Sequence, residues 1–219
     1  MDSVFAVWKP KGPTSHDVVD AVRRATGERR VGHAGTLDPL AEGVLVIATG
    51  KSTKLLASLV GKEKEYLATV ELGQRSETDD AEGRKTPVLV VVRPKRADIL
   101  KTLPHFVGDI EQVPPAYSAV KSAGRRAYQL ARAGRKPELK PRKVSVRSMK
   151  LISYKCPYLK LRITTGPGVY VRSLARDIGQ ALGTGGYVAA LERVRVGDFT
   201  KRACVKSYPL VEISAKSKV

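Results

Sequence analysis

The sequence predicts an α+β fold with a central sheet of mixed, mostly antiparallel strands, flanked by helices and loops. Short β-branched or alternating segments recur along the chain, and segments with helical periodicity lie between them at irregular intervals. Hydrophobic residues make up 42% of the 219 residues, which is enough for a substantial core. The apolar runs are too short to cross a bilayer, so we expect no membrane segment.

Strands and helices alternate over the first third of the chain. A loop followed by a helix is predicted within residues 12–27, with Ser15 as the N-cap and Gly27 as the C-terminal stop. A buried face for this helix is indicated by Val18, Val19 and Val22. The other predicted elements are an apolar strand at 4–10, a buried strand at 43–50, a helix at 51–61 and an alternating strand at 64–73.

The rest of the chain contributes further strands and helices. After a polar turn at 74–87, the run VLVVVRP at 88–94 is strongly β-branched and predicts a strand. Pro114 and Pro115 exclude a helix from the extended segment 112–122. The remaining elements are a helix at 96–106, a helical patch at 127–134, paired antiparallel strands at 143–155 and 158–165, a helix at 170–183 and a strand at 193–199.

The net charge of +19 is concentrated in the second half of the chain. Residues 1–120 hold 17 Lys and Arg against 16 Asp and Glu, whereas residues 121–206 hold 21 against 4. This excess, interleaved with Tyr128, Tyr158 and Tyr170, indicates a face that binds a polyanion. Nucleic acid is favoured over acidic lipid, because the sequence contains no strong basic amphipathic helix with an aromatic apolar face.

Metal, thiol and nucleotide-cofactor chemistry find little support in the sequence. Cys156 and Cys204 lie far apart without metal-type spacing, so we expect reduced thiols in a cytoplasmic protein. The three histidines are dispersed, and the acidic residues of 77–82 lack a calcium-loop pattern and fit a solvated turn. No phosphate loop of the Walker type occurs, and GTGG at 183–186 follows a helix instead of opening one. We therefore expect neither a metal nor a cofactor.

The segment GHAGTLDPLAEGVL at 32–45 places one carboxylate, Asp38, in a glycine-rich turn. Pro39 biases the residue before it towards an extended backbone, and the glycines allow a ligand to approach the main chain closely. A carboxylate presented in this way suits a nucleophile or a base, with His33 as the nearest helper in sequence. These residues also fit a turn aspartate that accepts local main-chain hydrogen bonds.

Several blocks of the sequence closely resemble the pseudouridine synthase family that modifies the T arm of tRNA. The strongest is GHAGTLDPLAEGVLVIATGKSTKL at 32–55, which is similar to the family's active-site motif. The other blocks follow in the family's order at 9–19, 64–83, 114–134, 166–183 and 191–199. This resemblance implies the pseudouridine-synthase fold and the isomerisation of a uridine, at position 55 of tRNA, without a cofactor.

The resemblance also implies roles for individual residues. Asp38 matches the essential aspartate, which attacks C1′ of the ribose, attacks C6 of uracil or abstracts the C2′ proton, depending on the mechanism. Tyr66 matches the tyrosine that stacks on the base, and Arg172 matches the arginine paired with the aspartate. Tyr170 matches a pocket residue, and His33 matches a histidine that supports the flipped nucleotide. From the residues alone, the tyrosines equally fit core aromatics, and Arg172 and His33 fit a solvated charge and a loop histidine.

The densest basic segment, at 121–143, overlaps the block that resembles the family's mobile RNA-clasping segment. Only Glu138 opposes its charge. We expect a hinged clasp whose cations contact phosphates, with a solvated charged helix as the alternative. The candidate residues are Lys121, Arg125, Arg126, Arg132, Arg135, Lys136, Lys140, Arg142 and Lys143.

Two features depart from the family's pattern. Tyr187 stands in GGYVAAL at 185–191 where a histidine is usual, which puts local contacts in doubt. Many members carry a small PUA-like RNA-binding domain after the catalytic one, whereas only about twenty residues follow Phe199 here. We therefore expect one catalytic domain at 1–205, a short tail at 206–219 and no PUA-like domain.

Three functions are compatible with the resemblance. The favoured one is a stand-alone, monomeric enzyme that acts on the T-arm stem-loop of tRNA without an obligate protein partner or a membrane. The second is a guide-RNA-dependent subunit that acts on rRNA, and the third is a non-catalytic tRNA-binding protein or folding chaperone. The intact set of Asp38, Tyr66 and Arg172 argues against a loss of activity.

Overall fold

The computed structural model describes residues 2–122 and 124–205, so the predicted tail at 206–219 lies outside the described residues. The chain forms two compact units, the first made of Met1–Leu67 and Leu191–Val219 and the second of Ala68–Ala190. Both combine helices with mostly antiparallel strand pairing, and the first also contains parallel pairs, which confirms the α+β prediction. In the part of the chain that the structure describes, no helix is long and apolar enough to cross a membrane.

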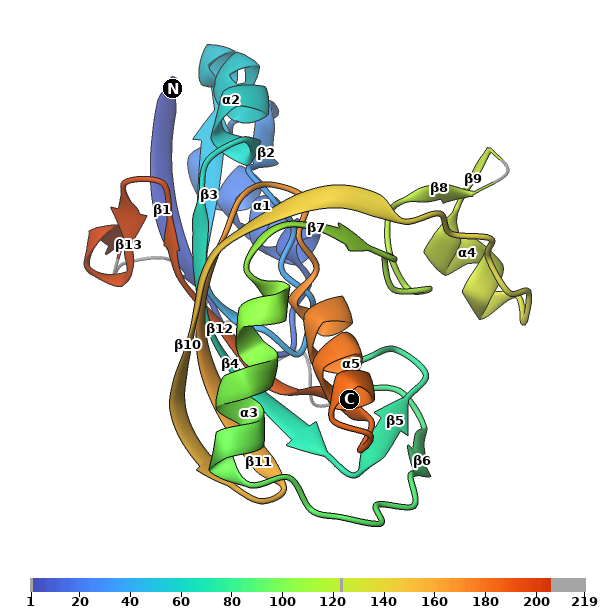
Figure 1. Ribbon diagram of the computed structural model, residues 1–219. Coiled ribbons are helices and arrows are strands. Elements are labelled where there is room, and N and C mark those ends of the chain that lie inside the picture. The colour runs from blue at the N-terminus through green and yellow to red at the C-terminus, as the bar shows by residue number, and fades with distance from the viewer. Residues whose placement is uncertain (1, 123, 206–219) are drawn as a thin grey trace. The chain divides into compact units, whose positions relative to one another are not determined.

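The strands of the first unit surround a central buried strand, β3. This strand pairs antiparallel with β1 and β2 and parallel with β12, and β1 pairs parallel with β14 (Figure 1). Every residue of β3 after the first is buried, as the continuous apolar run predicts. The bounds are β1 Ser3–Lys9, β2 Val31–His33, β3 Glu42–Thr49, β12 Gly186–Val196, β13 Phe199–Thr200 and β14 Cys204–Val205.

Helix α1 (Ser15–Thr26) contributes the predicted valine face to the core of the first unit. Val18, Val19 and Val22 are fully buried in one cluster with residues of β1, β2 and β3. Gly27 ends the helix in the left-handed region, with a φ of 66°, as predicted. The predicted helix at 51–61 is shorter and tighter than expected, since it consists of a 3-10 turn, η1 (Gly50–Leu55), followed by α2 (Leu56–Val60). A second 3-10 turn, η3 (Lys201–Ala203), lies near the end of this unit.

The start of α1 corrects the predicted N-cap. Thr14 is the capping residue, because its side chain accepts from the Asp17 amide and the Asp17 carboxylate accepts from the Thr14 amide at 2.7 Å. Ser15 is buried instead, and its hydroxyl bonds to the main chain of Leu37. The Ser15 hydroxyl, predicted to cap the helix, therefore holds the loop around Leu37 instead.

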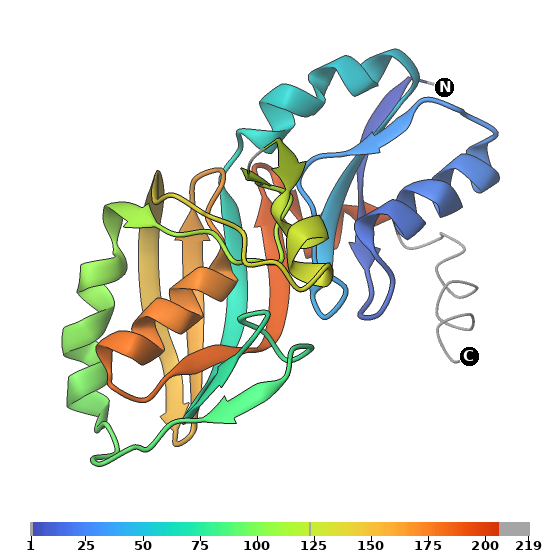
Figure 2. The ribbon, with the colours of Figure 1, turned by 90° about the vertical axis from the view of Figure 1, so that its right-hand side faces the viewer.

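The second unit contains a sheet with the strand order β4-β11-β10-β7, and the chain passes between the units within β4 and within β12. Helices α3 and α5 lie on the same face of this sheet (Figure 2). Small hairpins, β5–β6 and β8–β9, complete the unit. The bounds are β4 Lys64–Leu72, β5 Gln74–Ser76, β6 Lys85–Pro87, α3 Arg96–Thr102, η2 Leu103–Phe106, β7 Gly108–Gln112, β8 Lys121–Ser122, β9 Arg125–Arg126, α4 Ala127–Arg132, β10 Arg142–Lys155, β11 Tyr158–Thr165 and α5 Val171–Ala181.

Apolar side chains on β11 and α5 form much of the core of the second unit. Leu159, Leu161 and Ile163 alternate along β11 and are almost fully buried, and Leu174 and Ile178 of α5 are fully buried. This alternation is the pattern expected of a sheet with one buried face. The antiparallel pairing of β10 with β11 was predicted and is confirmed.

The predicted strand at 88–94 is wrong. Strand β6 ends at Pro87, and the following segment forms no strand, with Leu89 89% exposed and Val91 87% exposed. β-Branched residues favour a strand only where a neighbouring strand and an apolar surface receive them, and neither is provided here. The preceding residues, predicted as a turn, instead form the hairpin β5–β6 around a shorter turn.

A close approach of main chains at Gly43 generates a prediction about stability. Gly43 has a φ of 129°, and a Cβ there would lie 2.3 Å from the Arg193 carbonyl oxygen. We expect Gly43→Ala to lower the free energy of unfolding by at least about 3 kcal/mol, from backbone strain and overpacking together. Gly73→Ala is the matched control, because Gly73 also has a positive φ but open space around it, so strain alone costs about 1–2 kcal/mol. Urea unfolding measures both losses, and equal losses would contradict the close approach.

Candidate functional site

The turn that carries Asp38 lies between β2 and β3 and is fixed by main-chain contacts. The Ser15 hydroxyl accepts from the Leu37 amide at 2.8 Å and donates to the Leu37 carbonyl at 3.0 Å. The Gly12 amide donates to the Pro39 carbonyl at 2.9 Å, on the other side of Asp38. Asp38 itself is half-buried. The residues on both sides of the carboxylate are therefore held in place, as a preorganised site requires.

Lys9, the last residue of β1, also binds the main chain of this turn. Its side chain is fully buried, and its ammonium group donates to the carbonyls of Pro13 at 2.7 Å, Pro10 at 2.9 Å and Pro39 at 3.5 Å. The sequence places Lys9 in the predicted strand at 4–10 and at the start of the block 9–19, without a role of its own. A lysine inside the apolar run VFAVWKP was nevertheless a usable signal, because a buried ammonium needs several acceptors.

Arg193, on β12, also binds the main chain of the turn and is only 1% exposed. Its Nε donates to the Val44 carbonyl at 2.8 Å, Nη1 to the Thr36 carbonyl at 3.2 Å and Nη2 to the Gly35 carbonyl at 3.0 Å. Burial lowers the pKa of Arg193, and a hydrogen bond to the Tyr66 side chain and the charge of Asp38 oppose that shift. Asp38 and Tyr66, both predicted site residues, therefore converge on one guanidinium that the sequence analysis missed.

The same guanidinium affects two basic neighbours. Burial lowers the pKa of Lys64 to about 8, and repulsion by Arg193 adds to the shift. The Lys64 ammonium donates to the carbonyls of Val60 at 2.8 Å and Lys62 at 2.7 Å. Burial also lowers the pKa of His33, with contributions from Arg193 and His16, so that His33 is neutral at physiological pH. A neutral imidazole fits the predicted role of supporting a nucleotide rather than binding a phosphate.

Arg172 is the second residue of α5 in the second unit and is buried, which makes the solvated-charge alternative wrong. Its Nη1 lies 3.4 Å from a carboxylate oxygen of Asp80 and donates to the Thr78 carbonyl at 3.1 Å, and its Nη2 donates to the Tyr117 carbonyl at 3.0 Å. Asp80 is only 2% exposed, so the expectation of a solvated acidic turn at 77–82 is wrong for this residue. A carboxylate in this turn was buried because a buried guanidinium needed a counter-charge.

The acidic turn also binds the second arginine of α5. Arg176 pairs with Asp79 at 2.8 Å and with Asp177 at 2.9 Å. Burial raises the pKa of Asp79, although the charge of Arg176 opposes that rise. In the described residues no group of three or more His, Cys, Asp or Glu side chains could hold a metal ion.

Tyr170 immediately precedes α5, and both of its main-chain polar groups bond to one glutamine. Its carbonyl accepts from Gln112 Nε2 at 3.1 Å, and its amide donates to Gln112 Oε1 at 2.8 Å. The structure therefore groups the predicted residues by unit, with His33, Asp38 and Tyr66 in the first and Tyr170 and Arg172 in the second. The pairing of Asp38 with Arg172 joins residues of different units and stays a prediction.

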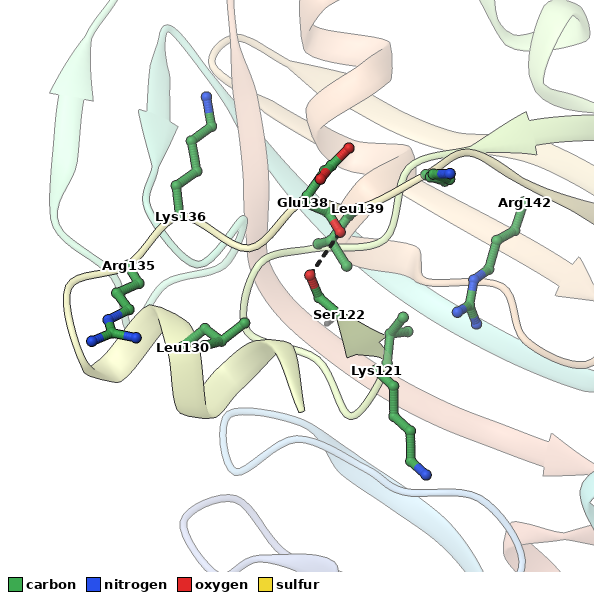
Figure 3. Close-up of a pocket in the computed structure, with 10 residues that line it drawn as sticks. Lys121, Ser122, Leu130, Arg135, Lys136, Glu138, Leu139 and Arg142 are labelled. Carbon is green, nitrogen blue, oxygen red and sulfur yellow. Dashed lines mark hydrogen bonds between the residues drawn. The ribbon is translucent and has the colours of Figure 1, made fainter. Parts of the chain in front are cut away.

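The basic segment projects beyond the ends of β7 and β10 in the second unit (Figure 1). All of its candidate cations are exposed. A cavity of about 450 Å³ is lined by Lys121, Arg135, Lys136 and Arg142 and by the side chains of Leu130 and Leu139, and the ammonium ends of Lys121 and Lys136 point away from it (Figure 3). The Ser122 hydroxyl donates to the Glu138 carbonyl at 2.9 Å and closes the segment on itself. Cations around a partly apolar hollow suit the phosphates and sugar-base faces of a polynucleotide.

Comparison with known proteins assigns the family. Residues 23–171 match the TruB family pseudouridylate synthase (N terminal domain), and residues 172–218 match the tRNA pseudouridylate synthase B C-terminal domain. The chain belongs to the TruB family of pseudouridylate synthases. The resemblance drawn from the sequence blocks is thereby confirmed.

Individual TruB relatives are similar over most of this chain. The tRNA pseudouridine synthase B of Thermobifida fusca is 48% identical over 91% of this chain and 71% of its own length. The protein of the same name from Rhodospirillum rubrum is 47% identical over 92% of this chain and 65% of its own. The chain thus spans about two thirds of the length of these relatives.

Solved structures support the same fold. A crystal structure of a Cbf5-Nop10-Gar1 complex contains a chain 30% identical to this one, with a TM-score of 0.70 over 90% of this chain and 50% of that chain. A structure of an H/ACA RNP bound to a substrate RNA containing 2′-deoxyuridine gives 27% identity and a TM-score of 0.67 over 90% and 48%. These similarities confirm the pseudouridine-synthase fold.

The Tyr187 departure from the TruB pattern has a local structural explanation. The tyrosine is 5% exposed, and its hydroxyl donates to Glu71 Oε2 at 2.6 Å. The Lys85 ammonium lies 5.1 Å from the centre of its ring. Burial and the Glu71 carboxylate raise the pKa of Tyr187, which keeps the phenol protonated. Within the second unit, Tyr187 therefore joins β12, β4 and β6 through its own hydrogen bond and ring contact.

The low pKa of Lys64 predicts a dependence of stability on pH. The pKa of Lys64 is about 8 in the folded chain and 10.5 in its reference state, so the unfolded chain binds more protons between these values. Stability due to this lysine therefore increases as the pH rises. Relative to Lys64→Met, the free energy of unfolding of the wild type should gain about 1–2 kcal/mol between about pH 8 and about pH 9.5. Urea titrations of both proteins measure this gain, and a difference that is independent of pH would contradict the buried ammonium.

Proposed function

We propose that this chain isomerises a uridine in the T arm of tRNA, at position 55, to pseudouridine. The observation that carries the proposal is the Asp38 turn, where a half-buried carboxylate and Tyr66 share the guanidinium of Arg193. The membership of the chain in the TruB family and the relatives named tRNA pseudouridine synthase B give the reaction and the substrate class.

The reaction exchanges one glycosidic bond for another. The bond between C1′ and N1 breaks, a bond between C1′ and C5 forms, C5 loses a proton and N1 gains one. Asp38 acts as the nucleophile or base that starts this exchange, through attack on C1′, attack on C6 or removal of the C2′ proton. The product is an isomer of the substrate, so the chemistry balances without an oxidant or a reductant.

A stacked uridine is inaccessible, so the enzyme has to flip the nucleotide out of the RNA at a cost of a few kcal/mol. Stacking of the flipped base on Tyr66 contributes about 1–3 kcal/mol, which offsets part of this cost. We assign to Arg172 the role of the family's arginine that pairs with the essential aspartate, and to Tyr170 that of a pocket residue. His33, as a neutral side chain, supports the RNA where the nucleotide has flipped out.

The basic segment contacts the RNA backbone and orients the T-arm stem-loop. Its exposed cations supply phosphate contacts, which position an RNA without reading its sequence. Discrimination then depends on the shape of the folded loop, because the deep groove of an RNA helix hides its bases.

We further propose that the chain acts alone, as a monomer, and not as a guide-RNA-dependent subunit. Relatives named tRNA pseudouridine synthase B are 44–48% identical to it, against 30% for the chain of the Cbf5-Nop10-Gar1 complex. The alternative is a non-catalytic tRNA-binding protein or chaperone. The Asp38→Asn experiment below distinguishes it from an enzyme.

Asp38→Asn should abolish product formation and leave RNA binding within about threefold of the wild type, because the amide keeps the shape of the side chain and loses the charge. Pseudouridine is mapped in an unmodified tRNA transcript after incubation with each purified protein. Asp20→Asn is the matched control, since Asp20 lies on the same unit in a surface pair with Arg23 at 2.7 Å. An inactive wild type, or equal product from Asp38→Asn, would contradict the proposed enzyme.

Arg135→Ala combined with Lys136→Ala should weaken tRNA binding and lower the slope of log Kd against log salt by about 1.5, since two phosphate contacts are lost. Lys51→Ala with Lys54→Ala removes the same charge from exposed positions in the first unit and serves as the control. Binding titrations at several salt concentrations measure both slopes. If the two double variants behave alike, only the net charge matters, and the basic segment is not the RNA contact.

A further inference from the structure

Arg193 reaches both candidate reacting groups of the first unit from a fixed position. A guanidinium has five N–H donors, and three main-chain carbonyls, of Gly35, Thr36 and Val44, take one each. Tyr66 accepts a further hydrogen bond from this guanidinium, and the negative charge of Asp38 acts on it as well. The carbonyls of Gly35 and Thr36 belong to the turn that leads directly into Asp38.

The main chain around Arg193 is itself tightly placed. β12 and β3 run parallel with Arg193 opposite Gly43, and the two main chains approach so closely that a side chain at Gly43 has no room. On the other edge of β12, the Gly197 amide donates to the Glu63 carbonyl at 2.8 Å, close to the start of β4. The guanidinium therefore extends from a strand that is paired on both edges. Its position is set by this strand and not by the turn that it binds.

We propose that Arg193 is a positioning residue for uridine isomerisation, which sets the Asp38 carboxylate and the Tyr66 hydroxyl at a fixed separation around its guanidinium. This inference rests on the proposed function. Arg193 contacts the turn and the tyrosine, so it acts through them and not on the RNA. A displacement of about 1 Å between reacting groups can cost on the order of a hundredfold in rate, which is the effect that such a residue prevents.

Lysine cannot replace this arginine, although it keeps the charge. An ammonium is a compact point charge, whereas the planar guanidinium spans acceptors that lie in different directions. The charged or titratable groups around Arg193 are Asp38 and Tyr66 together with the basic side chains of Lys64 and His33, whose pKa values it lowers. The Lys9 ammonium already brings a positive charge to the turn, so the geometry of the donors is what Arg193 adds.

The kinetic test compares Arg193→Lys with Arg195→Lys. Arg195 lies two residues further along β12, where its side chain is 28% exposed and its Nε lies 3.4 Å from Glu65 Oε2. We expect Arg193→Lys to lower kcat by about tenfold to a hundredfold while KM for the tRNA transcript changes by less than about threefold. Arg195→Lys should leave both within about threefold of the wild type. A loss in KM alone, or an unchanged kcat in Arg193→Lys, would overturn the proposal.

A double-mutant cycle tests whether Arg193 acts through Tyr66. Tyr66→Phe removes only the hydroxyl, so once it is absent Arg193→Lys should cost less than it does in the wild type. Strictly additive losses would show that the two residues act independently and would overturn the proposal. Thermal unfolding of each variant separates these rate effects from a loss of folded protein.

A measurement on side-chain nitrogens covers the case in which Arg193→Lys does not fold. In ¹⁵N-arginine-labelled wild type, the buried guanidinium should give N–H signals that exchange slowly with water, and these signals should shift in Tyr66→Phe. Protected arginine signals that stay unchanged in Tyr66→Phe would overturn the proposal. This measurement does not depend on catalysis. If the wild type is inactive but the signals shift in Tyr66→Phe, the proposed function is rejected and the hydrogen bond between Arg193 and Tyr66 is still supported.

Discussion

The turn that presents Asp38 has main-chain carbonyls that no strand pairs, and buried cations bind them. Lys9 donates to Pro39 on one side of the carboxylate, and Arg193 donates to Gly35 and Thr36 on the other. An unpaired buried carbonyl and an unpaired buried cation are each costly, so every such contact removes two penalties at once. These cations, which come from β1 and β12, therefore help to stabilise the irregular backbone that a presented carboxylate requires.

Local patterns were sufficient wherever local forces decide the structure. The valine spacing of α1 and its terminal glycine, and the antiparallel pairing of β10 with β11, were predicted and confirmed. The burial of Arg193 had no such signal. Arg193 and Arg195 share one face of β12 by strand alternation, yet only Arg193 meets carbonyls about 150 residues earlier in the chain. A sequence pattern can place a cation on a face, but it cannot show which acceptors that face will meet.

The errors have the same origin. The segment after Pro87 has the composition of a strand, but no neighbouring edge or apolar face receives it, so Leu89 remains exposed. The acidic turn has the composition of a solvated loop, but the buried Arg172 draws Asp80 out of solvent. In both places the local composition indicates the correct intrinsic preference. The outcome depends on a distant partner, which is absent for the segment after Pro87 and is Arg172 for Asp80.

Each unit holds its share of the proposed catalytic set before any RNA arrives. The Asp38 turn is fixed by Ser15, Lys9 and Arg193, and Arg172 is fixed by Asp80 and by main-chain carbonyls of its own unit. Chemistry on a flipped base depends on groups that do not have to reorganise when charge develops, because reorganisation at that moment would add to the barrier. Folding supplies this order, so that the binding energy of the RNA remains available for flipping the nucleotide.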